Sequence, residues 1–331
     1  MSAAASQILE QFNVAFVKFL DPNTPQEERS AIDRAFVDFE KQPDSWRVCL
    51  EMMTLTTNPN IHLIIQDTFI YVLKHRWLTL NTGEKNTIRE SEIAFYVNGF
   101  RSYRLNIMQL TAKTIAWISI MESDQCLQQL LDFISGGLQN PAECDPQLLL
   151  LLVLLEEVYE TGNSIPLLTE KRDTIQKVIS DGVCGIVQSV NAILQHAAEL
   201  SEDTIRESLN ILLILIPHND LSRVLDVSVV ECLFRFISDF NNPLSLDAMK
   251  CVNELLLKHL IPYSFRSVYC RIINTITSLM LAVAQDVDAI SPEYTKQLIL
   301  LVYELTVNYI TPMLAQPDFD LVQYLAALLH S

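Results

Sequence analysis

The sequence predicts an all-α protein, an α-solenoid or superhelix built from antiparallel, HEAT-like helix pairs. Only seven glycines occur in 331 residues, far below the usual share of about 7 %, and the turn clusters that bound strands are missing. Apolar residues recur at spacings of three and four, as in Phe12, Phe16, Phe19 and Leu20, which is the period of an α-helix. The predicted helices pair at about 40 residues per unit, the length of HEAT and armadillo repeats.

The helix pairs follow one another along the whole chain. We expect residues 6–20 to pair with 25–41, 44–56 with 60–78, 82–98 with 102–121, 124–137 with 146–160, 170–199 with 202–216, 222–239 with 244–260 and 263–285 with 292–314. A last helix over 317–330 opens a further pair. Its apolar face favours an array that continues beyond the end of this chain, since a terminal repeat shows a polar outer face.

Several helix ends are marked in the sequence. Thr24-Pro25, Asp145-Pro146 and Ser291-Pro292 each place a capping oxygen before a proline suited to the first helical position, and Thr24 with Glu27 matches a capping box. Gly136-Gly137 indicates the end of a helix. Gly162–Pro166 and Pro217–Asp220 are expected to be loops between helices.

The stretch from Trp46 to Trp77 explains why so much apolar surface carries no chemistry. It reads as a helix, a polar turn over residues 56–60 and a second helix. One such hairpin cannot bury its own apolar faces, but hairpins stacked in a row cover one another. We therefore interpret both tryptophans as core residues between repeats.

Composition limits the partners and the compartment. The formal net charge of −17 argues against direct nucleic-acid binding, which draws on clustered lysine and arginine, and fits either contact with basic proteins or simple solubility. The longest apolar run, residues 148–155, is eight residues long, whereas a membrane span needs about 20, so no membrane insertion is expected. Seven scattered cysteines without a C-x-x-C pair are typical of buried thiols in a reducing compartment.

The sequence contains no constellation that predicts catalysis. Its six histidines stand apart, without the spacing of a metal site, and neither a G-x-x-x-x-G-K nor a G-x-G-x-x-G motif occurs. We expect no enzyme activity, metal or cofactor. Residues 105–169 carry one base, Lys113, against eight acids; this excess could attract a basic partner, and a solvated face explains it equally well.

Two segments in the first hundred residues carry a recognisable pattern, "FLDPNTPQEERSAIDRAFVDFEKQPDSW" and "IIQDTFIYVLKHRWLTLNTGEKNTIR". A tryptophan opens the third helix, and basic residues with a tryptophan end the fourth. In these segments the chain resembles the N-terminal domain of importin-β-type transport receptors. Farther on, "LLLLLVLLEEVYE", "LDAMKCVNELLLKHLIPYSF" and "YTKQLILLVYELTVNYI" resemble exportin repeats. This resemblance divides the chain into residues 1–100, importin-β-like repeats, and residues 101–331, exportin-type repeats.

The resemblance implies a receptor that shuttles between nucleus and cytoplasm and binds GTP-bound Ran, a protein cargo and nucleoporins. The cargo that it suggests is actin with profilin. Receptors of this family grip Ran with the second helices of their first repeats, here 25–41, 60–78 and 102–121. The outward polar positions of these helices are the Ran-binding candidates: Arg34, Asp38, Asp67, Lys74, Asn106, Gln109 and Lys113.

Two other functions remain open from the sequence. In an import receptor of the same family, Ran-GTP would expel the cargo rather than promote its loading. In a HEAT-repeat scaffold the same fold would organise other proteins without binding Ran.

Overall fold

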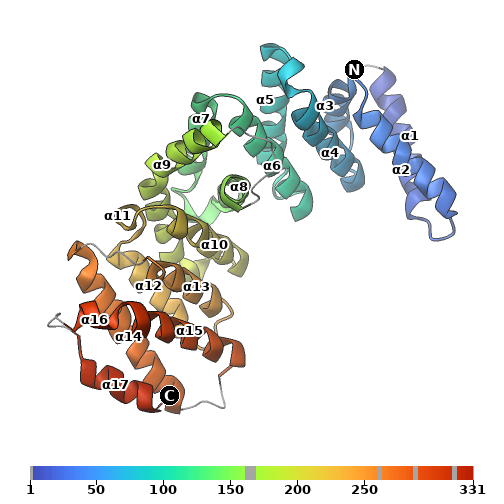
Figure 1. The fold of residues 1–331 in the computed structure, drawn as a ribbon. Coiled ribbons are helices and arrows are strands. Elements are labelled where there is room, and N and C mark those ends of the chain that lie inside the picture. The colour runs from blue at the N-terminus through green and yellow to red at the C-terminus, as the bar shows by residue number, and fades with distance from the viewer. Residues whose placement is uncertain (1–2, 161–168, 259–262, 286–289, 315–318, 331) are drawn as a thin grey trace. The chain divides into compact units, whose positions relative to one another are not determined.

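The computed structural model describes residues 3–160, 169–258, 263–285, 290–314 and 319–330. Within these residues every regular element is a helix and no strand occurs (Figure 1). This confirms the prediction of an all-α fold. The predicted loop over Gly162–Pro166 lies outside the described residues.

The chain divides into two compact units, residues 1–130 with 149–175 and residues 131–148 with 176–331. The elements of residues 3–160 are α1 (Ala3–Leu20), α2 (Gln26–Glu40), α3 (Ser45–Leu55), α4 (Pro59–His75), the 3-10 turn η1 (Trp77–Thr79), α5 (Thr82–Gly99), α6 (Leu105–Met121), α7 (Asp124–Gly137), η2 (Pro141–Glu143), α8 (Asp145–Leu155) and the π-helical turn η3 (Glu156–Glu160).

The remaining elements begin with α9 (Thr169–Gln195). They continue with η4 (Ala197–Glu199), α10 (Glu202–His218), α11 (Leu221–Val224), α12 (Val227–Ile237), α13 (Ser245–Leu256), η5 (Tyr263–Phe265), α14 (Arg266–Gln285), α15 (Pro292–Asn308), α16 (Ile310–Met313) and α17 (Leu321–His330).

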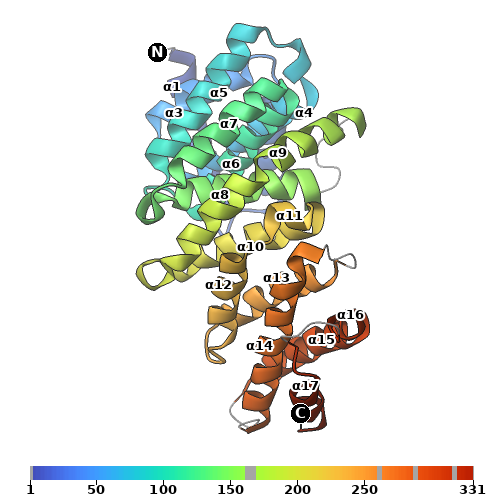
Figure 2. The same cartoon turned by 90° about the vertical axis from the view of Figure 1, so that its left-hand side faces the viewer.

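Consecutive pairs stack in register within the first unit. The first helices of the pairs contact one another, α1 with α3 and α3 with α5, and the second helices do the same, α2 with α4 and α4 with α6. In Figure 2, α1, α3 and α5 lie on the left of the first unit and α4 lies on its right. This alternation is the arrangement of a HEAT-like solenoid, in which each pair buries the apolar face of its neighbour.

The second unit repeats the same rule. Its second helices contact in sequence, α10 with α13 and α13 with α15, and the first helix α12 contacts α14. Leucines, isoleucines and valines fill the interior between the layers; Leu212, Leu215, Val252 and Leu255 are fully buried. Burial of this kind contributes about 1.5–3 kcal/mol for each large apolar side chain.

Helix ends in one pair are bonded by side chains that arrive from a later pair. Arg76, after α4, donates to the carbonyls of Lys41 and Gln42 at the end of α2. In the second unit, the Lys258 ammonium donates to the carbonyls of Pro217 at 2.7 Å and Asn219 at 3.0 Å, at the end of α10. Because the last carbonyls of a helix have no partner inside it, these donors fasten consecutive repeats together.

Tyrosine hydroxyls also donate to carbonyls at helix ends in the second unit. The Tyr294 hydroxyl donates to the carbonyl of Ile237 at 2.7 Å, at the end of α12. The Tyr309 hydroxyl lies within hydrogen-bond distance of the carbonyls of Leu256 and Lys258, the latter at 2.6 Å, at the end of α13. Both tyrosine side chains are buried, so their ring packing and their hydroxyl bonds act together.

The predicted helix starts are confirmed in part. At α15, Ser291 Oγ accepts from the Tyr294 amide at 3.1 Å, as expected for a cap before Pro292. The prediction of a capping box at Thr24 and Glu27 is wrong, because the Thr24 hydroxyl points back and donates to the carbonyl of Lys18 at 2.6 Å. Asp145 is itself the first residue of α8, and its carboxylate accepts from the Thr204 hydroxyl at 2.7 Å.

Two other expectations need correction. Pro217 and His218 were expected in a loop, but α10 extends through both residues, and only Asn219 and Asp220 lie outside it. The Lys258 ammonium supplies donors to the carbonyls there, which stabilises this last turn. Of the seven cysteines, six are buried free thiols as predicted and Cys184 is exposed.

Two of the described helices, α9 and α14, are long and apolar enough to cross a membrane by length and composition. Core helices of soluble proteins pass the same test, and 44 % and 56 % of the residues in their apolar windows are buried inside the structure. The absence of membrane insertion stays a prediction.

Candidate partner-binding face

The seven candidate residues lie on three consecutive second helices of the first unit. Arg34 and Asp38 are on α2, Asp67 and Lys74 on α4, and Asn106, Gln109 and Lys113 on α6. Because α4 contacts both α2 and α6, these residues share one face of the unit, which we call the second-helix face. All are exposed except Lys113, which is half-buried.

The α2 part of the face is held by local contacts. Arg34 Nε donates to the carbonyl of Ser30 at 3.1 Å, one turn earlier. Asp38 pairs with Lys41 at 3.6 Å, and both side chains are exposed, so this ion pair is worth little. Both candidates can therefore turn toward a partner at small cost.

A concentration of negative charge lies where α2 meets α4. Burial raises the pKa of the Glu40 carboxyl, at the end of α2, and the nearby Asp67 raises it further. Burial likewise raises the pKa of Asp67, although the residue as a whole is exposed. The Asp67 carboxylate has lost water without gaining a cation, and it therefore favours an incoming basic group.

At the other end of the face, two candidate lysines converge on one indole ring. The ammonium groups of Lys74 and Lys113 each lie 5.1 Å from the centre of the Trp117 ring, close enough for cation–π attraction. Trp117 Nε1 donates to Glu157 Oε2 at 2.8 Å, and Lys113 pairs with Glu157 Oε1 at 2.7 Å. Glu157 therefore neutralises Lys113, while Lys74 stays exposed.

The π-helical turn η3 supplies Glu157. This turn contacts α6 and lies in the "EEVYE" end of a segment that sequence analysis related to exportins. A related contact joins the preceding pairs: Trp77 Nε1 donates to Glu122 Oε1 at 2.9 Å, and Lys85 pairs with that carboxylate at 3.1 Å. The Trp46 and Trp77 side chains are buried, which confirms their predicted packing role.

A polar network is buried beneath the second-helix face. Gln66 Nε2 donates to Glu92 Oε1 at 3.3 Å, and the Thr114 hydroxyl donates to Gln66 Oε1 at 3.1 Å. Glu92 is fully buried and its Oε2 has no hydrogen-bond partner. Burial raises the pKa of this carboxyl to about 8, so the network joins α4, α5 and α6 through a neutral acid.

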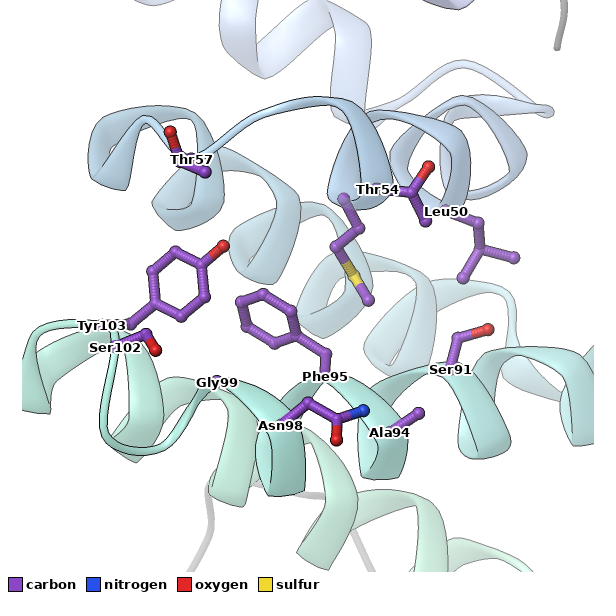
Figure 3. Close-up of a pocket in the computed structure, with 11 residues that line it drawn as sticks. Leu50, Thr54, Thr57, Ser91, Ala94, Phe95, Asn98, Gly99, Ser102 and Tyr103 are labelled. Atoms are coloured by element: carbon purple, nitrogen blue, oxygen red, sulfur yellow. The ribbon is translucent and has the colours of Figure 1, made fainter.

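A groove of about 540 Å³ opens between α3 and α5, on the layer of first helices (Figure 3). Phe95 and Tyr103 form its aromatic wall, and both rings also pack on the buried His62 ring, with centres 4.8 and 4.6 Å away. Burial lowers the pKa of His62, which favours the neutral imidazole. None of the seven candidates lines this groove.

The described residues contain no cluster of metal ligands. No group of three or more histidine, cysteine, aspartate or glutamate side chains among them could hold a metal ion. Carboxylates of the acidic stretch 105–169 already have internal partners; those of Glu122, Asp145 and Glu157 bond side chains more than 35 residues away in the chain. Their charges serve the contacts between helices, in addition to any effect on a partner.

Sequence analysis missed two residues of the second-helix face. Glu157 lies 44 positions after Lys113 in the chain, and no pattern in the sequence indicates that they meet. Tyr71 lies between Asp67 and Lys74 on α4 and is half-buried; its position one turn from each, on the exposed side, was the available signal.

The fold and its contacts define a helical-repeat protein of the HEAT type, a class that presents extended surfaces to other proteins. Residues 106–252, from α6 to α13, match the family model described as exportin 1-like protein. This match supports the resemblance to the importin-β/exportin family and covers less than half of the chain. No curated protein matches the chain.

Proposed function

We propose that this chain is a nuclear export receptor, or a portion of one, that binds GTP-bound Ran and a protein cargo. The observation that carries the proposal is the match of residues 106–252 to the exportin 1-like family model. The family includes transport receptors without enzymatic activity, and such receptors shuttle between nucleus and cytoplasm through contacts with nucleoporins.

The second-helix face is the proposed site for Ran. It lies on the second helices of the first three pairs, and it carries an acid, Asp67, and a base, Lys74, whose charges suit a polar protein surface. An array of stacked pairs also changes curvature by small shifts at each repeat. Ran bound at one end can then bias cargo binding elsewhere, provided that the two arrangements differ in their contacts.

We propose that the chain is related to the actin-exporting receptor, exportin six, and that its cargo is actin with profilin. The segments "WRVCL" and "AMKCVNELLLKHLIPYSF" support this assignment by resemblance. The division into residues 1–100 and 101–331 belongs to the same proposal. An import receptor of the family is the alternative, and a scaffold that does not bind Ran is the second.

Pull-down of purified chain with Ran locked to GTP or to GDP tests the proposal. We expect capture by the GTP form alone. Loss of this capture, with any longer native chain also tested, would favour the scaffold. If Ran-GTP binds, the affinity for actin–profilin measured with and without it decides the direction, because an export receptor gains cargo affinity and an import receptor loses it.

A further inference from the structure

The exposed side of α4 carries one acid, one aromatic ring and one base in a row. Asp67, Tyr71 and Lys74 are spaced by four and three residues, so they lie on one face of the helix. The opposite side of α4 is buried through Ile65, Phe69, Val72 and Leu73. We call the three exposed or half-buried residues the α4 stripe.

Neither charge of the α4 stripe is neutralised inside the protein. In the described part of the chain, no ion pair involves Asp67 or Lys74, whereas Lys41, Lys85 and Lys113 each have a carboxylate partner. Lys74 instead lies over the Trp117 ring, which leaves the ammonium free to donate a hydrogen bond to a further partner. Both ends of the stripe are therefore available.

The surroundings give the stripe a definite polarity. Glu40 adds negative charge beside Asp67. At the other end Glu157 neutralises Lys113, so Lys74, over the same Trp117 ring, is the positive charge that remains. Asp67 and Lys74 are seven residues apart, which corresponds to about 10 Å along a helix. The stripe thus presents a minus and a plus at a fixed distance.

Tyr71 occupies the middle of the stripe and is already held in place. Its ring packs against the His75 ring at 4.5 Å between centres, and the Arg76 guanidinium lies 5.7 Å from the Tyr71 ring centre. Arg76 is itself fixed by its bonds to the end of α2. A half-exposed tyrosine that is held in this way loses little entropy on binding and suits the centre of an interface.

We propose that the α4 stripe sets the orientation in which the GTPase of the proposed function docks. The docking segment presents a basic group to Asp67, an acidic group about 10 Å away to Lys74, and an apolar group to Tyr71 between them. This inference rests on the proposed function, since it names the partner of the same face. Recognition depends on the order of the charges and not on their sum.

Exchanging the two charged residues tests whether recognition depends on the order of the charges along α4 or only on their sum. The double variant Asp67→Lys/Lys74→Asp keeps the net charge of −17 but reverses the polarity of the stripe. The dissociation constant of the whole chain for Ran loaded with a non-hydrolysable GTP analogue is measured by calorimetry. We expect the swap to weaken binding at least 100-fold and Tyr71→Ala to weaken it about 10-fold.

Matched controls use exposed charges on and beside the other layer. Glu90→Lys/Arg101→Glu is a swap at exposed positions on α5 and just after it, and it should leave the affinity unchanged. Because every altered position is exposed or half-buried, the helical circular dichroism of each variant should equal that of the unmodified chain. A variant that unfolds would be replaced by the single reversal Lys74→Glu, for which we expect at least a 10-fold loss.

The outcomes distinguish a failure of this inference from a failure of the proposed export function. If neither the unmodified chain nor any longer native chain binds Ran-GTP, the proposed function and this inference are both wrong. If the unmodified chain binds and the swapped variant binds equally well, the inference is wrong and the function stands. Selective loss with the α4 swap supports both.

Discussion

Replacing Glu92 with glutamine tests whether the first unit keeps a neutral acid in its interior. Glu92 lies on α5, fully buried, and touches Gln66 of α4 through one hydrogen bond of 3.3 Å. Its pKa is raised from 4.5 to about 8, with burial as the main cause. Glutamine has nearly the same shape, stays neutral at every pH and can keep the bond from Gln66.

The sign of the effect follows from proton binding. Between pH 4.5 and about 8, the folded state holds a proton on Glu92 that the unfolded chain has released. The free energy of unfolding therefore falls as pH rises through this window, at about 1.4 kcal/mol per unit. The contribution is fully present below pH 4.5 and fully lost above about pH 8.

The Glu92→Gln variant escapes this loss. Relative to the unmodified chain, it should gain stability, and the gain should grow by about 3 kcal/mol between pH 6 and pH 8.5. Both values lie above the sequence pI of about 4.7, so solubility is preserved. Urea unfolding followed by circular dichroism measures the difference, and amide exchange in α4, α5 and α6 localises it.

Glu90→Gln is the matched control, since Glu90 lies on the same helix with an exposed side chain. It should show no gain that grows with pH. The reasoning about burial would be refuted by a Glu92→Gln protein that is equally or less stable at pH 8.5, or by a difference that does not change with pH.

Three further substitutions probe single contacts. Tyr309→Phe removes the hydroxyl that bonds two carbonyls at the end of α13 and should lower the free energy of unfolding by about 1–3 kcal/mol; unchanged amide exchange there would contradict this. Glu157→Ala leaves the Trp117 N–H and Lys113 without their acceptor and should cost about 2 kcal/mol in urea unfolding, with Glu157→Gln costing less. Gly99→Ala places a Cβ 2.8 Å from the Tyr103 ring and should cost about 1–3 kcal/mol, whereas Gly136→Ala, with nothing within 4 Å, should not.

Helix positions could be predicted because the apolar residues of each pair recur with the period of an α-helix, and because the sequence marks many of the helix ends. Residues 124–137 were expected as a helix and form α7 with the same bounds, and 82–98 became Thr82–Gly99. The cap at α5 was missed: Asn81 and Glu84 make the full reciprocal capping box there. An asparagine or threonine before a helix has several possible partners, and only the course of the loop decides among them.

The candidate face could be predicted only as a set of exposed positions. Helical spacing placed six of the seven residues on the surface, since apolar neighbours define the buried side. The state of Lys113 depends on Glu157, which reaches it from a π-helical turn. A turn of this kind shifts every following side chain around the helix axis, so the register of ordinary helical counting is lost.

The donors that finish the ends of α2 and α10 enter the chain 34 to 41 residues after the carbonyls they bond. The ribosome therefore releases the hairpins that end in α2 and α10 before the donors for these carbonyls exist, and each of the two is completed only when about one more repeat has emerged. Folding during synthesis should advance one hairpin behind translation, with the newest hairpin always the loosest. A pause in translation within the array would then expose a single frayed end rather than a wholly unfolded chain.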